Sequence, residues 1–294
     1  MEIKMKHALI IGDGWVANNR HKPAFAKLGV KYHAYDIKHH ENKVLQNNNY
    51  DFALLSTPPQ SRLATLKACI NAGIKTIFLE KPLAHTLSDA EEIKSLIDAN
   101  GISARSCHNF LFSRVGNAIL NAKDIRTIVF YQLNRADRQF PAWIYQLDHG
   151  IGLDEFPHMG YLARAISREH GLLDPKIRYI DDALSSVNKW QIEYSCNDGF
   201  VTCDLWRDAV YINIASEQRP YWQYKEEWNE GKTRITSVVH RVFSRLVRRI
   251  PNDFGTNQMW KCFLNNTLSD EQNKLTSIDL SLEILNDFLK TKAK

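Results

Sequence analysis

The sequence has no long apolar run, no apolar signal-like segment near its first residues and no paired-cysteine motif. No stretch approaches the run of about 18 apolar residues that a membrane-spanning helix needs. The five cysteines are odd in number and none is part of a C-x-x-C pair, which argues against a disulfide framework and against a zinc site. We therefore expect a protein of a reducing compartment, the cytoplasm, that holds no metal.

The chain also has only a small excess of positive over negative charge. The formal net charge is only +5 and is spread along the chain, so nothing demands a nucleic acid, although an anionic substrate would be favoured. There are no repeats or low-complexity segments. With 294 residues, 44% of them hydrophobic and 24% charged, the chain has the size and composition of one large globular domain or two ordinary ones.

The first part of the chain alternates between short β runs and helical patterns, which is typical of a parallel, doubly wound α/β sheet. The pattern predicts strands at His7–Ile11, Tyr32–Tyr35, Phe52–Leu55 and Thr76–Leu79, and helices at Trp15–Leu28, Gln60–Ala72 and Asp89–Asn100. We expect Ser88 to cap the last of these helices, with Glu91 as its capping-box partner, and Gly73 and Gly101 to end two of them.

After about residue 120 the pattern changes to strands with period-two alternation, typical of an antiparallel sheet in an α+β domain. Strands are predicted at Ile125–Leu133, Ile177–Asp181, Trp190–Tyr194, Phe200–Trp206 and Val210–Ala215, and helices at Asp154–His170, Gln258–Asn266 and Ser277–Thr291. Asn197-Asp198-Gly199 predicts a hairpin between two of the strands. The sequence thus predicts two domains, residues 1–120 and residues 121–294.

A glycine-rich turn, Gly12-Asp13-Gly14-Trp15-Val16-Ala17, follows the first predicted strand and precedes a predicted helix. Glycines in this position allow a tight turn and close approach of the backbone to a pyrophosphate, which the helix N-terminus stabilises. Asp36, at the end of the next strand, would accept hydrogen bonds from ribose hydroxyls and repel a 2′-phosphate, so NAD is favoured over NADP. The basic residues 38–40 would soften that preference. The alternative is a plain βα turn in an unrelated doubly wound fold.

Glu80-Lys81-Pro82 ends the fourth predicted strand. Pro82 fixes the turn and therefore the direction in which Lys81 points. The carboxyl ends of parallel strands are also where open α/β sheets bind ligands. Lys81 is thus a candidate for contact with a cofactor or substrate; the alternative is a solvated charge, with Glu80 as a cap or an ion-pair partner.

Asp154 and His158 are four residues apart, so they share one face of a helix. A carboxylate one turn away can hold a histidine in one orientation and tune it as a base. The alternative is a structural histidine with a capping aspartate near the helix start, where Pro157 would be tolerated in the first turn.

Taken in order, these elements resemble the glucose–fructose oxidoreductase and inositol dehydrogenase family, often written Gfo/Idh/MocA. The resemblance covers nearly the whole chain, and its most specific element is residues 68–84, which contain Glu80-Lys81-Pro82. It also includes Ser56-Thr57-Pro58-Pro59 after the third strand, Asn109 after the next strand, and residues 150–154 ahead of His158.

The resemblance implies a Rossmann domain followed by a domain with an open, mainly antiparallel sheet that holds the substrate against the nicotinamide. It also implies that Lys81 bonds the reacting oxygen, that His158 exchanges the hydroxyl proton, and that Asp154 positions the substrate or His158. The implied cofactor-binding residues are Gly12, Asp13, Gly14, Trp15, Val16, Asp36, Ser56, Thr57, Pro58, Glu80, Lys81 and Asn109.

Three positions depart from the family's pattern. Arg62 stands where a histidine is frequent, Phe156 where a glycine is common, and Tyr161 where an aspartate is often found. We expect these changes to alter the shape of the pocket more than the class of reaction.

Arginines and aromatic residues between the predicted strand and the Asp154 helix suggest a substrate with a phosphate or carboxylate. Arg135, Arg138 and Trp143, with Tyr145 and His149 nearby, are the candidates. Arg219, Trp222 and Tyr224 form a second such group. The alternative for both groups is a set of ordinary solvated loop residues.

Residues 238–250 have the pattern of a basic amphipathic helix that ends at Pro251. Contact with an anionic membrane surface is one interpretation. The more frequent role of such a helix is to cover a sheet or a subunit interface. We also expect a homo-oligomer.

The leading hypothesis is an NAD-dependent oxidoreductase that acts on a secondary hydroxyl or ketone of a sugar, sugar nucleotide or cyclitol. Two alternatives stay open: a cofactor-bound sensor or accessory protein without turnover, and a reductase of an imine or another non-sugar substrate.

Overall fold

The computed structural model describes residues 6–36, 49–113, 116–117, 120, 125–133, 142–145, 150–169, 176–179, 190–196, 199–207, 209–216, 222–227 and 255–290. They form two compact units. The first contains Met1–Asn109, Leu153–Tyr161 and Thr256–Lys290, and the second contains Phe110–Gly152, Leu162–Gly255 and Thr291–Lys294. The C-terminal helices therefore belong to the same unit as the N-terminal sheet, although the sequence grouped them with residues 121–294.

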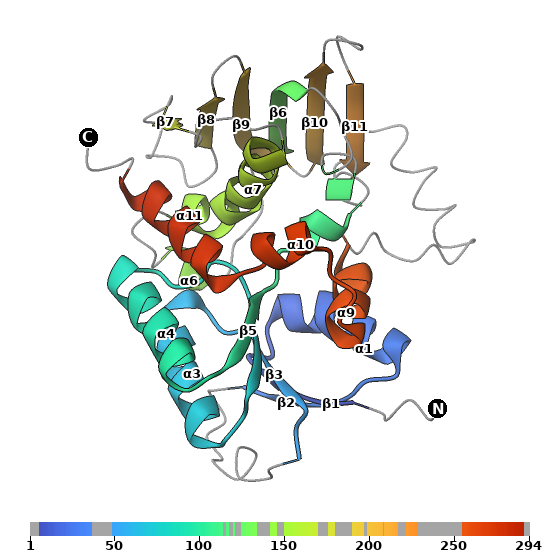
Figure 1. Ribbon diagram of the computed structural model, residues 1–294, viewed down its shortest axis with the longest axis vertical. Helices are drawn as coiled ribbons and strands as arrows, with labels where there is room; N and C mark the ends of the chain where they lie inside the picture. Colours follow the sequence, from blue (N-terminus) through green and yellow to red (C-terminus); the bar gives the residue numbers. More distant parts are fainter. Residues whose placement is uncertain are drawn as a thin grey trace. The chain divides into compact units, whose positions relative to one another are not determined.

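The first unit is built on a parallel sheet with the strand order β2-β1-β3-β4-β5 (Figure 1). Its strands are β1 (His7–Ile11), β2 (Lys31–Tyr35), β3 (Phe52–Leu55), β4 (Thr76–Leu79) and β5 (Ser103–Ser106). All pairings are parallel. The sequence predicted β1, β3 and β4 with these bounds, because a strand covered on both faces is a short continuous apolar run. The predicted doubly wound Rossmann sheet is confirmed.

Helices cover both faces of this sheet. They are the π-helix η1 (Ala17–His21), α1 (Lys22–Leu28), the 3₁₀ helix η2 (Pro59–Ser61), α3 (Arg62–Asn71) and α4 (Leu87–Ala99). Figure 1 shows α3 and α4 on one side and α1 on the other, as right-handed crossovers require. The predicted cap Ser88 is wrong: the Thr86 side chain accepts from the Asp89 backbone N–H, so the helix begins earlier.

Three C-terminal helices complete the first unit: α9 (Thr256–Asn265), α10 (Asp270–Leu275) and α11 (Ile278–Lys290). Helix α10 was not predicted from the sequence, although Ser269 and Gln272 form a capping box that marks its start. Trp260 of α9 is fully buried and contacts Phe25, Phe52 and Phe78. Burial of large aromatic side chains of this kind is a main source of stability, so α9 is an integral part of the unit's core.

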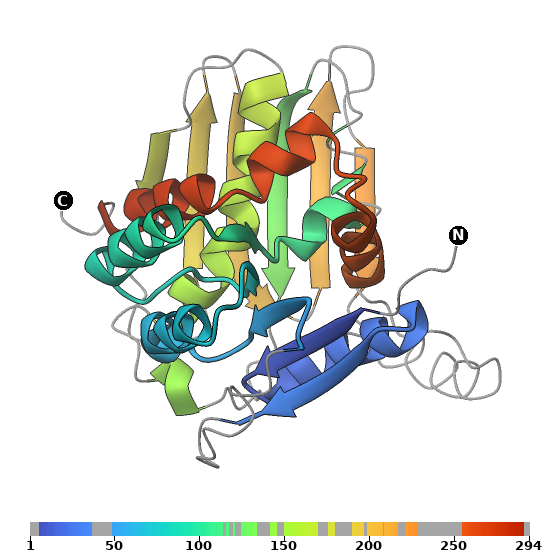
Figure 2. The same cartoon turned by 60° about the horizontal axis from the view of Figure 1, so that its bottom comes forward.

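The second unit contains one six-stranded sheet with the order β11-β10-β6-β9-β8-β7 (Figure 2). Its strands are β6 (Ile125–Leu133), β7 (Lys176–Tyr179), β8 (Trp190–Cys196), β9 (Gly199–Arg207), β10 (Ala209–Ser216) and β11 (Trp222–Glu227). Among the described strands of this second sheet, β6 and β9 pair in parallel and the other neighbours pair antiparallel. The predicted hairpin is confirmed by the pairing of Cys196 with Gly199. The sequence analysis missed β11.

The remaining described elements are the 3₁₀ helix η3 (Asn109–Phe112), the short helix α6 (Ala142–Tyr145) and the long helix α7 (Gly150–Glu169). Because α7 begins at Gly150, Pro157 lies inside it and not in its first turn, which corrects the prediction. Within the described part of the chain, no helix is both long and apolar enough to span a membrane.

Candidate active site

Most of the predicted cofactor residues lie at one end of the parallel sheet. Gly12, Asp36 and Ser56 directly follow β1, β2 and β3, Glu80 follows β4, and Asn109 lies three residues beyond β5. The carboxyl ends of parallel strands meet at the same edge of a sheet, so the fold gathers these positions there.

The glycine turn has the backbone that its sequence predicts. Gly12 has a φ of +98°, and a Cβ built on it would lie 2.5 Å from the Ser56 carbonyl oxygen. A larger residue therefore fits neither the conformation nor the space. Around Gly14 there is open space instead, with nothing within 4 Å of a built Cβ. The two glycines thus serve different needs, close packing at the first and an approachable backbone at the second.

Charged and aromatic groups flank the turn. Asp13 pairs with Lys22 of α1 at 2.6 Å and accepts from the Asn18 side chain at 2.8 Å. Trp15 is 52% exposed, and the Arg20 guanidinium lies 5.5 Å from the centroid of its ring. Asp36 is half-buried at the end of β2.

The loop after β3 contains a buried polar atom that fits a bound cofactor. Thr57 Oγ1 has no hydrogen-bond partner among the described residues, although it is shielded from water. Buried hydroxyls are nearly always satisfied, so an unpaired one beside a glycine turn is typical of a site that a ligand completes. The turn, the approachable Gly14 backbone and Thr57 together suit a dinucleotide.

Lys81 contacts the helix that carries the other two predicted catalytic residues. Its ammonium donates to Asp154 Oδ1 at 2.9 Å and to the Asp154 carbonyl at 2.8 Å. Pro157 has no N–H, so the α-helical ladder is broken at this turn of α7, beside the carbonyl that accepts from Lys81. Both side chains are largely buried, and the bond from Lys81 to Pro82 is a cis peptide.

His158 is 4% exposed, and its Nδ1 lies 2.7 Å from the Tyr161 hydroxyl. The sequence predicted that Asp154 would position the substrate or this histidine; the described hydrogen bonds of the Asp154 carboxylate go to Lys81. Burial, and then the positive charge of Lys81, lower the pKa of His158 well below its usual value. The imidazole is therefore neutral near pH 7, the state in which it can accept a proton.

Tyr161 is held in turn by His108. The two rings stack with centroids 4.3 Å apart, and His108 Nδ1 donates to the Leu275 carbonyl at 2.7 Å. Burial lowers the pKa of His108 to about 4, although the bond to Leu275 opposes this. The sequence analysis treated Tyr161 only as a departure. Its position three residues after His158 on one helix was the signal of a contact.

Glu80 is fixed by residues distant in sequence. Its Oε1 lies 2.7 Å from His21 Nε2, and the Trp260 indole donates to His21 Nδ1 at 2.9 Å. An indole N–H only donates, so Nδ1 is the acceptor and Nε2–H donates to the carboxylate. Burial would raise the pKa of Glu80 most, but the bond from His21 and the charges of Lys81 and Arg62 hold it below its usual value. Nothing in the sequence indicates this network.

Arg62, another position that departs from the family's pattern, is 1% exposed at the first position of α3. Its guanidinium donates to the carbonyl oxygens of Thr57, Glu80 and Pro82. Burial lowers the pKa of Arg62 to about 10, so the group keeps its charge at neutral pH. The third departure, Phe156, packs against Phe288 of α11 with ring centroids 4.7 Å apart.

The predicted substrate residues are placed only in part. Trp143 lies half-buried on α6, and Trp222 and Tyr224 belong to β11. Arg135, Arg138, His149, Arg219 and the basic segment 238–250 lie outside the described residues.

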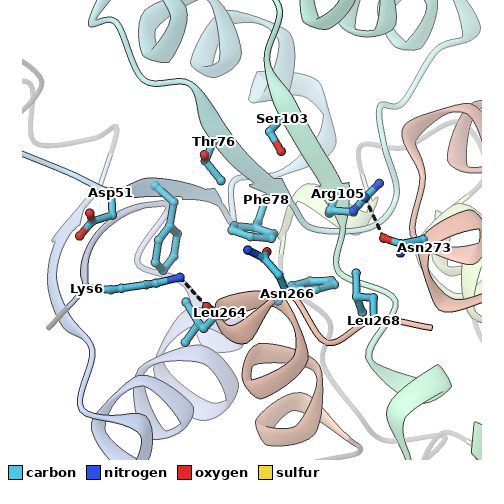
Figure 3. A pocket seen from close by; sticks show the side chains of 12 residues that line it. Lys6, Asp51, Thr76, Phe78, Ser103, Arg105, Leu264, Asn266, Leu268 and Asn273 are labelled. Atoms are coloured by element: carbon cyan, nitrogen blue, oxygen red, sulfur yellow. Dashed lines mark hydrogen bonds between the residues drawn. The ribbon is translucent and has the colours of Figure 1, made fainter. Parts of the chain in front are cut away.

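A cavity of about 500 Å³ lies at the opposite, amino end of the sheet (Figure 3). Lys6, Asp51, Thr76 and Ser103 line it from just before β1 and β3 and from the first residues of β4 and β5. It contains none of the predicted cofactor or catalytic residues. The chemistry-bearing groups therefore lie at the other end of the strands.

Residues 8–105 match the Gfo/Idh/MocA family model, which describes an oxidoreductase family with an NAD-binding Rossmann fold. This Rossmann part of the chain, residues 8–105, belongs to the Gfo/Idh/MocA family. The matched residues therefore have the NAD-binding Rossmann fold of an oxidoreductase family.

Solved dehydrogenase structures share this Gfo/Idh/MocA fold. A probable dehydrogenase from Thermotoga maritima is 15% identical, with 98% of this chain and 96% of that chain covered and a TM-score of 0.67. The scyllo-inositol dehydrogenase from Lactobacillus casei, with bound NAD(H) and scyllo-inositol, is 14% identical over 99% and 96%, with a TM-score of 0.61. UDP-N-acetylglucosamine 3-dehydrogenase GnnA from Acidithiobacillus ferrooxidans is 12% identical over 98% and 97%, with a TM-score of 0.62.

Such low identities show a shared fold. No curated protein sequence matches this chain. The predicted homo-oligomer and cytoplasmic location stay predictions.

Proposed function

We propose that this protein is an NAD-dependent dehydrogenase or reductase that acts on a secondary hydroxyl or ketone of a sugar, sugar nucleotide or cyclitol. The observation that carries the proposal is the pairing of Lys81 with Asp154 at 2.9 Å on the helix of the neutral, buried His158. The dehydrogenases of similar fold include one bound to scyllo-inositol and one named for a sugar nucleotide, which supports this class of substrate.

In the proposed mechanism, Lys81 donates a hydrogen bond to the reacting oxygen and stabilises the negative charge that develops on it. His158 takes the hydroxyl proton during oxidation and returns it during reduction. Its Nδ1 is engaged by Tyr161, so the exchange with substrate takes place at Nε2. Asp154 holds the Lys81 ammonium in place until the substrate oxygen arrives.

The cofactor would be held by the Gly12–Val16 turn, by Ser56, Thr57 and Pro58 after β3, and by Asn109. When bound, nicotinamide supplies the hydride chemistry. Asp36 would bond the ribose hydroxyls, which favours NAD over NADP because a 2′-phosphate would meet its carboxylate.

A fluorescence titration of the purified protein tests the cofactor, with its tryptophans as donors to NADH and, separately, to NADPH. We expect NADH to bind more tightly than NADPH. Asp36→Ala should reduce this difference in affinity between the two nucleotides. No binding of either nucleotide would contradict the proposal.

A substrate panel tests the reaction class. The protein is incubated with NAD⁺ and UDP-N-acetylglucosamine, free sugars or scyllo-inositol, and NADH formation is followed by absorbance and the product by mass spectrometry. We expect loss of two hydrogens from a sugar or cyclitol. A second set pairs NADH with imines and non-sugar ketones, and turnover of that set alone would show that the substrate class is wrong.

A further inference from the structure

The backbone of Lys81 is held on both sides by one buried side chain. Arg62 Nη1 donates to the carbonyl oxygen of Glu80, which precedes Lys81, and to that of Pro82, which follows it. The two carbonyl groups that flank Lys81 in the chain therefore accept hydrogen bonds from the same nitrogen atom.

The same guanidinium reaches a second loop. Arg62 Nη2 donates to the carbonyl of Thr57, in the segment after β3 that also carries the unpaired Thr57 Oγ1. A planar guanidinium holds its donors in a fixed fork, so the separation of the acceptors is fixed as well. Arg62 therefore links the proposed cofactor loop to the turn that presents Lys81.

The Glu80 side chain adds a third restraint. Its Oε2 accepts from the Lys81 backbone N–H at 3.1 Å, while Oε1 is bonded by His21. The carbonyls on either side of Lys81 and its own amide thus all have buried partners. The ammonium at the far end of the side chain donates to the carboxylate and the carbonyl of Asp154.

We propose that Arg62 is a positioning residue, which sets the distance between the cofactor loop after β3 and the reactive ammonium of Lys81. This inference rests on the proposed function, in which Lys81 contacts the reacting oxygen. A reacting group displaced by about 1 Å can lose about 100-fold in rate, so loss of the link should appear mainly in kcat.

The side chain that this role requires is specific. Three carbonyl acceptors need at least three N–H donors aimed in different directions. An imidazole has at most two, so Arg62→His should fail in the role. Lysine keeps the charge but concentrates its donors on one atom, so Arg62→Lys should restore the function only in part.

The test measures kcat, KM and NADH affinity for Arg62→Ala, Arg62→His and Arg62→Lys on the substrate found in the panel. Arg105→Met is the matched control, because Arg105 lies on β5 of the same sheet, at the cavity of the amino end, with a single described bond to Asn273. Lys81→Met is measured in parallel. Thermal melting and circular dichroism show which variants fold.

We expect kcat of Arg62→Ala to fall about 100-fold, with the Kd for NADH changed less than kcat and Arg105→Met unchanged. Added guanidinium at millimolar concentration should restore part of the activity of Arg62→Ala, since it can occupy the vacated space. It should not restore Lys81→Met. A merely structural role would not produce this rescue.

The outcomes separate the two proposals. If Lys81→Met turns over like the wild type, the proposed function fails. If Lys81→Met is inactive while Arg62→Ala keeps wild-type kcat, or loses it without rescue by guanidinium, the positioning role is overturned. If Arg62→Ala does not fold, Arg62→Lys decides: a reduced kcat at an unchanged melting temperature supports the role, and a wild-type kcat overturns it.

Discussion

The two ends of the parallel sheet in the first unit use similar residues in different ways. At the carboxyl end, Arg62 is 1% exposed and donates to three backbone carbonyls, and His108 and His158 are buried among other polar groups. At the amino end, Arg105 is half-buried and donates to one side chain at 2.8 Å, at the edge of an open cavity (Figure 3).

Burial of polar and charged groups is costly unless each is satisfied. A fold that concentrates such groups at one end of a sheet makes that end a candidate for chemistry, and the pKa values of Glu80, His108 and His158 are shifted there. The cavity at the amino end is lined by fewer buried polar groups. In this protein, the buried and mutually bonded polar groups at the carboxyl end therefore indicate the proposed active site better than the cavity at the amino end does.

The largest effect should come from His158→Ala. Removal of the residue proposed to exchange the proton should lower kcat by about 10²–10⁴-fold, with residual oxidation rising toward alkaline pH as hydroxide replaces the imidazole. Steady-state kinetics over a range of pH checks this. A flat pH profile with nearly wild-type kcat would remove His158 from the mechanism.

A smaller effect is expected for Tyr161→Phe, which deletes the hydroxyl 2.7 Å from His158 Nδ1 and keeps the ring that stacks on His108. Loss of one hydrogen bond corresponds to about a tenfold change in kcat, with NADH affinity unchanged. Equal loss of NADH affinity would mean that the variant perturbs the whole unit and not the orientation of His158.

Acid should destabilise the unit because of its carboxyl end. The folded state keeps His108 and His158 neutral below pH 6.5, whereas the unfolded chain takes up protons there, so stability falls as the pH falls from about 6.5 toward the folded pKa of about 4 for His108. Each histidine contributes up to about 1.4 kcal/mol per pH unit to the free energy of unfolding. Urea unfolding at several pH values measures the slope.

His108→Gln should reduce this slope, and His33→Gln, a change at an exposed position of β2, should leave it unaltered. If the free energy of unfolding depends on pH equally in both variants, other groups cause the acid sensitivity.

The smallest effect should come from the amino end. Lys6→Met and Arg105→Met remove the two cations that line the cavity, each of which has one described hydrogen bond, to Leu264 O and to Asn273 Oδ1. We expect kcat and NADH affinity to stay within about twofold of the wild type. A large loss of activity in either variant would break the comparison between the two ends.

Local features of the fold could be predicted from the sequence more readily than long-range contacts. Strands β1, β3 and β4 and the conformation of Gly12 were predictable, because apolar runs and glycine turns are encoded by neighbouring residues. The strand β11 was missed because its residues Trp222 and Tyr224 looked like a loop group for substrate. The helix α10 was missed because six residues give little periodicity.

The network around Lys81 was not predictable in the same way. Trp260 donates to His21, 239 residues away in sequence, and no local pattern indicates such a contact. Arg62 was noticed as a departure, but arginine is usually exposed, so its burial among carbonyls became visible only in the fold. Lys81 itself was predictable because the proline after it and the strand before it define its place.

The most direct measurement compares wild type and Lys81→Met for turnover of the identified substrate and for NADH affinity. The account predicts that turnover falls by at least about 10²–10³-fold while the Kd for NADH changes little, because the ammonium acts on the reacting oxygen and not on the nucleotide. Wild-type turnover in Lys81→Met would contradict the account, including the proposed active site at the carboxyl end of the sheet.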